Sequence, residues 1–241
     1  MTPSRAWPAA LCLAALLPSA NAAGLQPLTG DGPAPPAPWH VLGLPGNTTK
    51  PLTQFSLESA HGKQALRIEA DKSYANLVHD LPAGTAVGTL SWQWQIDQLN
   101  EAADLHRKSG DDTTVKVCAM FDMPLDKVPF VERNVLRFAR SKTTDPVPSA
   151  TICYVWDDRL PVGTWIDSPF THQLHYLVLQ SGAQGATDWH AEKRDLAADF
   201  LKAFADETTE LPPLIGIAIG ADADNTQGHS VAHVAEIVLG P

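Results

Sequence analysis

Residues 222–228 concentrate oxygen-bearing side chains directly after an apolar, strand-like run. Asp222, Asp224 and Asn225 supply three such side chains within four residues, and calcium takes about six to eight oxygen ligands. The spacing differs from that of a helix-loop-helix calcium loop, because the twelfth position is His233 rather than a glutamate. The segment therefore predicts a structural calcium site. An ordinary polar turn is the alternative, since Asp, Asn and Gly are common turn formers.

Two adjacent carboxylates, Asp111 and Asp112, follow Gly110 just ahead of an alternating segment. In an extended chain neighbouring side chains point to opposite sides, so we expect one carboxylate to find a partner and the other to face solvent. An acid–base role requires a second carboxylate nearby, such as Asp222 or Asp224. The catalytic candidates are therefore Asp111, Asp112 and Glu192, and a solvated turn is the alternative.

Aromatic side chains are the third group that could contact a ligand, because flat rings stack on the apolar faces of sugars. Trp92 and Trp94 share the apolar face of one predicted strand, which favours a place in the core. The ligand-binding candidates are Trp165, Trp156, Tyr154 and Arg194. In an extended chain Arg194 shares a face with Glu192, so an ion pair between the two is the alternative role.

Most of the chain after residue 50 alternates apolar and polar residues with a period of two, which is typical of β-strands. Strands are predicted over residues 65–70, 76–81, 89–96, 113–121, 151–156, 174–181, 214–219 and 231–239. Residues 214–219 are apolar on both faces and should form a central strand. Asp195 can cap a helix that extends to Phe204.

The remaining long segments contain turn and breaker residues. Residues 100–112 are predicted to form a loop with a helical turn, and residues 122–149 a proline-rich irregular connection. Strands without alternating helices indicate a mostly β fold, an antiparallel jelly-roll-type β-sandwich with one short helix.

The N-terminus predicts export. Residues 9–17 form an apolar run after Arg5, and a small-x-small pattern ends at Ala22, as in a secretory signal peptide. We therefore expect cleavage near Ala22, a periplasmic or secreted location, and no membrane span in the mature chain. Residues 1–22 are the signal peptide, residues 23–49 a flexible Pro/Gly-rich entry segment, and residues 50–241 one β-sandwich domain.

Composition limits the partners. The chain has a net charge of −10, which argues against binding to nucleic acid. The sequence has no Gly-x-Ser-x-Gly elbow, His-Glu-x-x-His pair, phosphate loop or Cys-x-x-Cys pair, and we predict no organic cofactor.

Cys118 and Cys153 are the cysteines that remain after cleavage. An oxidising compartment permits a disulfide between them, with two buried thiols as the alternative.

Several of these segments together resemble an exported bacterial family called domain of unknown function 3047. The matching segments span about residues 40–239. They are Ser91-Trp92-Gln93-Trp94, Gly110-Asp111-Asp112, Tyr154-Val155-Trp156, Gln180-Ser181-Gly182, Trp189 with Glu192, Arg194 and Asp199, and residues 219–228. The set is also similar to the jelly-roll sandwiches of galactose-binding-like and carbohydrate-binding modules, an analogy of fold only.

The chain departs from the expected family pattern at His233 and Ala235, and in residues 122–149, which are longer and richer in proline. Because the family has no assigned activity, the resemblance implies a fold and no catalytic residues. We predict an exported, non-catalytic binding protein that holds a glycan or another envelope ligand. The alternatives are an enzyme acting on cell-envelope polysaccharide through paired carboxylates, and an envelope protein-interaction module with a large exposed apolar patch.

Overall fold

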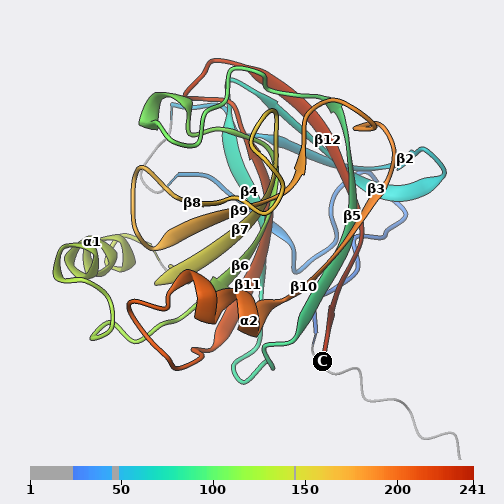
Figure 1. Ribbon diagram of the computed structural model, residues 1–241. Coiled ribbons are helices and arrows are strands. Elements are labelled where there is room, and N and C mark those ends of the chain that lie inside the picture. Colours follow the sequence, from blue (N-terminus) through green and yellow to red (C-terminus); the bar gives the residue numbers. More distant parts are fainter. Residues whose placement is uncertain (1–23, 45–48, 144) are drawn as a thin grey trace, which may run out of the picture.

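Two β-sheets pack face to face in the computed structural model, which describes residues 24–44, 49–143 and 145–241 (Figure 1). The seven-stranded sheet has the order β1-β4-β11-β6-β7-β9-β8, and the five-stranded sheet has the order β10-β5-β12-β3-β2. The strands are β1 (His40–Leu42), β2 (Gln54–Ala60), β3 (Lys63–Asp71), β4 (Tyr74–Asp80), β5 (Thr89–Gln98), β6 (Thr113–Phe121), β7 (Ala150–Asp157), β8 (Trp165–Asp167), β9 (Leu174–Ser181), β10 (His190–Asp195), β11 (Leu214–Asp222) and β12 (His229–Gly240). The predicted mostly β sandwich is confirmed, although β7 and β9 run parallel.

The core lies between the sheets and follows the alternation in the sequence. Trp92 and Trp94 of β5 are buried and contact each other edge to face, with ring centroids 5.4 Å apart. Strand β11 lies between β4 and β6 and is buried along most of its length, so the prediction of a central strand is confirmed.

In the part of the chain that the structure describes, two α-helices are present rather than one. The predicted helix is α2 (Leu196–Ala203), whose N-terminus is capped by the Asp195 carboxylate accepting a hydrogen bond from the N–H of Ala198. Phe200 and Phe204 from this segment are fully buried and close one end of the core. The predicted helical turn in residues 100–112 is the 3₁₀ turn η1 (Lys108–Gly110).

Helix α1 (Phe130–Arg140) lies inside the segment that was expected to be irregular. Pro129 directly precedes it, and proline is compatible with a helix N-terminus. Leu136 packs against the core, whereas four other apolar side chains of the helix are exposed, at Phe130, Val131, Val135 and Phe138. The prolines of residues 122–149 therefore lie before and after this helix, where they limit its length without preventing it from forming.

The described part of the Pro/Gly-rich entry segment packs against the sandwich. Strand β1 pairs with β4, and Trp39 and Leu28 are buried. The indole N–H of Trp39 donates to the carbonyl of Gln26 at 2.9 Å. The predicted signal peptide, residues 1–22, lies outside the described residues. No helix within them is long and apolar enough to cross a membrane.

Candidate functional site

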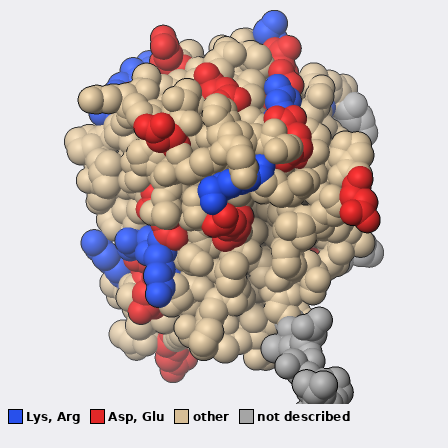
Figure 2. Space-filling model, turned by 90° about the vertical axis from the view of Figure 1, so that its right-hand side faces the viewer, with Lys and Arg blue, Asp and Glu red and all other residues tan. Residues whose placement is uncertain are grey.

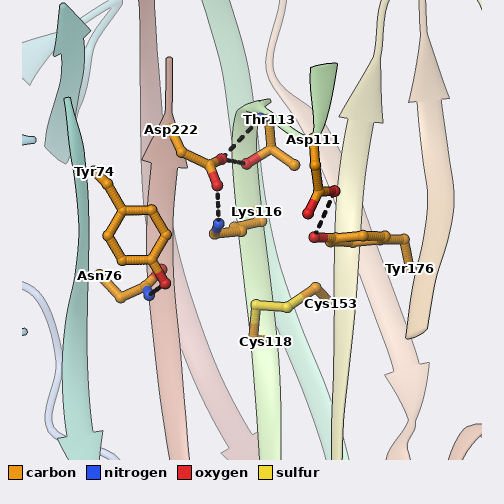
Figure 3. Close-up of a disulfide and its surroundings, with 9 residues drawn as sticks. All are labelled: Tyr74, Asn76, Asp111, Thr113, Lys116, Cys118, Cys153, Tyr176 and Asp222. Carbon is orange, nitrogen blue, oxygen red and sulfur yellow. Dashed lines mark hydrogen bonds and ion pairs between the residues drawn. A yellow bond between two sulfur atoms is a disulfide. The ribbon is translucent and has the colours of Figure 1, made fainter. Parts of the chain in front are cut away.

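The outer face of the seven-stranded sheet carries a group of polar side chains, most of which are buried (Figure 3). Val115, Val117 and Ala119 of β6 face the core between the sheets, so the alternate residues Lys116 and Cys118 face outward. The polar side chains on this face come from β4, β6, β9, β11 and the end of the 100–112 loop. We call them the outer-face network: Tyr74, Asn76, Asp111, Thr113, Lys116, Tyr176 and Asp222.

An ion pair lies at the centre of the network. Lys116 Nζ is 2.8 Å from Asp222 Oδ2, and each side chain is at most 7% exposed. The other oxygen of Asp222 accepts hydrogen bonds from the backbone N–H of Thr113, at 2.7 Å, and from its hydroxyl. Burial alone would lower the pKa of Lys116, but the Asp222 carboxylate raises it above its ordinary value, so the lysine stays charged.

Asp111 lies beside this pair. Its Oδ1 accepts a hydrogen bond from the Tyr176 hydroxyl at 3.1 Å. Burial, together with the nearby charge of Asp222, raises the pKa of Asp111 to about 6. Burial also raises the pKa of Tyr176 well above its ordinary value, so its hydroxyl remains a donor.

Asp112 joins two loops beside the network. Its carboxylate accepts from the backbone N–H of Thr226 at 2.7 Å and from the Thr226 hydroxyl at 2.6 Å. It also accepts from the side-chain amide of Asn225 at 3.2 Å. The expectation that one of the two adjacent carboxylates faces solvent is wrong, because Asp111 and Asp112 are 6% and 1% exposed. The chain is not extended there: Asp111 forms an inverse γ-turn, in which the Asp112 N–H donates to Gly110.

Tyr74 and Asn76 form the partly exposed side of the network, on β4. The Asn76 amide donates to the Tyr74 hydroxyl at 3.1 Å, and Lys116 Nζ lies 5.2 Å from the centre of the Tyr74 ring. The Asn76 Oδ1 atom has no hydrogen-bond partner among the described residues. It lies directly over Gly220, where an added Cβ would come within 2.1 Å of it. Gly220 thus leaves the room that the Asn76 side chain occupies.

The residues predicted to bind calcium lie together but already have partners. Asp222 pairs with Lys116, Asp224 pairs with Lys50, and Asn225 directs its amide nitrogen toward Asp112. Among the residues that the structure describes, no group of three or more His, Cys, Asp or Glu could hold a metal ion. Calcium at this loop stays a prediction.

Cys118 and Cys153 are joined in a disulfide that lies next to the network. The two residues are direct cross-strand partners on β6 and β7, with their Cα atoms 4.0 Å apart. Both are 3% exposed and pack with Leu105, Val155 and other apolar side chains on the outer face. The disulfide therefore crosses the middle of the same sheet that positions Lys116.

Glu192, the third catalytic candidate, lies away from the network. Its Oε1 accepts from the indole N–H of Trp94 at 3.2 Å and from the amide of Gln180 at 2.8 Å. Burial raises the pKa of Glu192. Glu192 is on β10 of the five-stranded sheet and contacts Trp94 in the core between the sheets, whereas Asp111 lies on the outer side of the seven-stranded sheet. They are not arranged as an acid–base pair across one cleft.

The ligand-binding candidates are also separated from the network. Tyr154 is fully buried, and its hydroxyl donates to Asp199 at 2.8 Å. Arg194 pairs with Asp199 at 2.6 Å rather than with Glu192. These contacts anchor β10 to α2 and leave the Tyr154 ring no open face.

The two tryptophan candidates differ from each other. Trp156 is 2% exposed, and its indole N–H donates to the carbonyl of Gly182 at 3.0 Å. Trp165 is partly exposed, and Lys202 Nζ lies 5.5 Å from its ring centre. Trp165 is therefore the ring from this set that a ligand could reach.

Two surface hollows, of about 560 and 550 Å³, lie outside the network. One is lined by the end of β5 and the loops at residues 99–102 and 183–187. The other lies beside the start of α1 and is lined partly by His172, His175 and Glu207. None of the predicted site residues lines either hollow.

The carboxylates of the network already accept hydrogen bonds from neighbouring side chains, so they are not free to act as an acid–base pair. Sequence reasoning missed Lys116, Tyr74 and Asn76. For Lys116 the signal was present, because it is a lysine within a strand that is otherwise suited to burial. Tyr74 and Asn76 gave no signal, since their position beside Lys116 and Asp222 depends on the pairing of β4 with β11, which lies far away in the sequence.

Comparison with known proteins places the chain in one family. No curated protein matches it. One similar solved structure, described as TmCBM61 in complex with beta-1,4-galactotriose, covers 84% of this chain and 87% of its own, at 10% identity and a TM-score of 0.35. A family model matches residues 37–238. Because that match covers most of its length, the chain belongs to the family described as "Protein of unknown function (DUF3047)".

Proposed function

We propose that this chain is an exported, non-catalytic binding protein that holds a neutral, hydroxyl-rich ligand such as a glycan on the outer face of its seven-stranded sheet. The observation that carries the proposal is the position of Tyr74 and Asn76 beside the buried Lys116–Asp222 pair. The Asn76 Oδ1 atom is buried against Gly220, but the side chains of Tyr74 and Asn76 are partly exposed, so the Tyr74 ring offers a sugar an apolar surface and the Asn76 amide nitrogen lies beside it.

Rigidity supports binding at this face. Lys116 and Asp222 belong to adjacent strands and satisfy each other, so the floor beneath Tyr74 is fixed before a ligand arrives. A preorganised surface loses less conformational freedom when it binds. The Cys118–Cys153 disulfide ties the next strand to the same floor.

The catalytic alternative rests on Asp111, whose pKa of about 6 suits a general acid. Glycoside hydrolysis also requires a second, available carboxylate. Asp222, the carboxylate that shifts the Asp111 pKa, already accepts from Lys116 and Thr113. We therefore place Asp111 in the binding surface rather than in a reaction.

Export and calcium are part of the proposal. The apolar run and small-x-small pattern of residues 1–22 support export to the periplasm or beyond. Expression with the leader and N-terminal sequencing of the mature protein tests export, and we expect a chain that begins at residue 23.

Calcium binding at Asp222, Asp224 and Asn225 is tested by titrating calcium into protein pretreated with a chelator, in a calorimeter. If no heat of binding is detected, calcium is no longer part of the proposal.

A second candidate function, a protein-interaction module, is favoured by helix α1. Phe130, Val131, Val135 and Phe138 are 59–73% exposed on one helix. Apolar clusters of this kind often mark interaction sites. Replacing Phe130 and Phe138 by Ser should leave the melting temperature unchanged and lower binding of a hydrophobic dye. Unchanged dye binding would remove this candidate.

A glycan array tests the leading proposal. The mature chain should bind at least one neutral envelope glycan, and Asn76→Ala should reduce that signal at least tenfold. Binding to no array member contradicts the proposal. If Asn76→Ala binds as well as the wild type, the glycan site does not include Asn76 of β4.

A further inference from the structure

Helix α1 has an uncovered apolar face on the outside of the molecule. The helix lies at one side of the sandwich, outside both sheets (Figure 1). Phe130, Val131, Val135 and Phe138 fall within an arc of about 140° around the helix axis, because an α-helix has 3.6 residues per turn. These four residues are 59–73% exposed. An exposed apolar cluster of this kind marks a surface that another molecule covers.

The other side of α1 holds the helix to the sandwich. Leu136 packs against the core, and Glu132 accepts a hydrogen bond from the Thr171 hydroxyl at 2.9 Å. The Arg133 guanidinium donates to backbone carbonyls of the segment just before the helix. Glu132 is the only acidic residue in α1, so no carboxylate of the helix lies on its apolar face.

Basic side chains border this face. Arg137 is exposed, and its guanidinium has no hydrogen-bond or ion-pair partner in the part of the chain that the structure describes. Lys142, just after the helix, is also exposed, and its Nζ lies 5.0 Å from the centre of the Phe138 ring. Residues 126–142 contain five basic and two acidic residues, whereas the whole chain has a net charge of −10. The region around α1 is therefore basic on an acidic protein.

A loop next to α1 has the same combination of ring and cation. Thr171 contacts the helix through Glu132, and the preceding residue, Phe170, is 54% exposed. Lys108 Nζ lies 5.3 Å from the centre of the Phe170 ring. Exposed phenylalanine rings with a lysine beside them thus occur both on the helix and in the adjoining loop.

We propose that α1 lies on the surface of an anionic phospholipid bilayer, with Phe130 and Phe138 at the boundary of the acyl chains and Arg137 and Lys142 at the headgroup phosphates. Helices of this kind bind through buried apolar area together with attraction between basic side chains and anionic lipids. Long basic side chains can reach the phosphates while their stems stay on apolar surface. With 11 residues α1 is about 16 Å long, so it would lie on the roughly 30 Å hydrocarbon core and not span it.

Charge favours a lipid surface over other occupants of this face. An anionic bilayer repels an acidic protein unless basic side chains gather on the side that approaches it. Figure 2 shows the side that faces away from α1, where acidic and basic side chains are interspersed. A symmetric dimer through α1 would instead bring two copies of Arg137 and Lys142 close together. The proposal shares no residue with the glycan site and does not depend on it.

Vesicle flotation tests the proposal. The mature chain should float with vesicles of equimolar phosphatidylglycerol and phosphatidylcholine and bind vesicles of phosphatidylcholine alone more weakly. Added salt should weaken the first interaction, because it screens the basic side chains. Phe130→Ser/Phe138→Ser should abolish flotation at an unchanged melting temperature. Arg137→Gln/Lys142→Gln should weaken binding by about fivefold for each cation removed.

A matched pair of variants separates the α1 face from exposed apolar surface in general. Val135 and Val238 are 59% and 54% exposed, and Val238 lies on β12 of the five-stranded sheet. Val135→Ser should weaken vesicle binding, and Val238→Ser should not. Asn76→Ala should bind vesicles like the wild type, and Phe130→Ser/Phe138→Ser should keep its glycan binding, so the two proposals can fail separately.

Two results of flotation would overturn the proposal. Absence of flotation with anionic vesicles would leave the face to a protein partner, and equal binding to both vesicle types would remove the role of the cations. Analytical ultracentrifugation without lipid provides a third test. A wild-type dimer that Phe130→Ser/Phe138→Ser converts to a monomer would assign the face to a second copy of the chain and also overturn the proposal.

Discussion

Lys116 and Asp222, which are 106 residues apart in the sequence, form an ion pair of 2.8 Å on the outer face of the seven-stranded sheet. Both side chains are almost completely removed from water. A buried ion pair of this kind compensates two desolvation penalties at once, so removing one partner exposes the penalty of the other. This pair fixes the floor on which Tyr74 lies.

Lys116→Met should lower the free energy of unfolding by about 3–5 kcal/mol, because Asp222 is then left as a buried charge without its counter-ion. Urea denaturation at neutral pH measures the loss. The double variant Lys116→Met/Asp222→Asn should recover most of it, since the asparagine can still accept from Thr113. If the double variant is as unstable as the single one, charge compensation is not what the pair provides.

Stability should depend on pH through Asp111. Its pKa in the folded protein is about 6, raised by burial above the ordinary value of 3.8. A raised carboxyl pKa favours the folded state fully below pH 3.8, and this contribution is lost as the pH rises through about 6. The contribution is roughly 3 kcal/mol.

The change that isolates this effect is Asp111→Asn, which can still accept from the Tyr176 hydroxyl. Between pH 4 and 7.5 the wild type should lose roughly 3 kcal/mol more than the variant in urea denaturation. Parallel stability curves for the two proteins would mean that Asp111 titrates near its ordinary range.

Loss of the Cys118–Cys153 disulfide should destabilise the protein. The bond closes a loop with a sequence separation of 35 residues, and cross-links of this length contribute about 3–4 kcal/mol by restricting the unfolded chain. The Cys118→Ala/Cys153→Ala variant should therefore unfold at lower urea concentration and keep its far-ultraviolet circular dichroism spectrum. A reductant should lower the urea concentration at which the wild type unfolds and leave that of the variant unchanged. An equal effect on both proteins would contradict the presence of the Cys118–Cys153 disulfide.

Gly220→Ala should weaken ligand binding more than tenfold, because the new methyl group would displace the Asn76 side chain. The same crowding should cost about 1–3 kcal/mol of stability. Gly32→Ala is the matched control, since a Cβ added there would meet no atom within 4 Å beyond its chain neighbours, and neither effect is expected. If Gly220→Ala binds the ligand with wild-type affinity, Asn76 does not contribute to the binding surface.

The strands with strict alternation were predictable from the sequence. Residues 113–121 and 174–181 were predicted as strands with the bounds that β6 and β9 have in the structure. Strand β10 was less visible because its sequence is mostly polar, and α1 because most of its apolar side chains face solvent rather than the core. Each element shows the residue alternation of its own secondary structure. Neither has a fully buried side in the structure, so the sequence did not show which element it packs against.

The site was only partly predictable, because its members come together through strand order. Asp111 and Asp222 were selected from the sequence, and the fold does bring them near each other. Lys116 was not selected, because a lysine in a strand is usually solvated and its burial depends on the pairing of β6 with β11. Glu192 was selected, but it lies on β10 of the other sheet and faces the core between the sheets.

The most direct test of binding at the outer face is calorimetric titration of the mature chain with the strongest glycan from an array, comparing Asn76→Ala with Asn134→Ala. Asn134 is exposed on α1 and far from the network in sequence and strand order. We expect wild-type affinity for Asn134→Ala and at least a tenfold weaker affinity for Asn76→Ala, at equal melting temperatures. Equal affinities for the two variants and the wild type would contradict it.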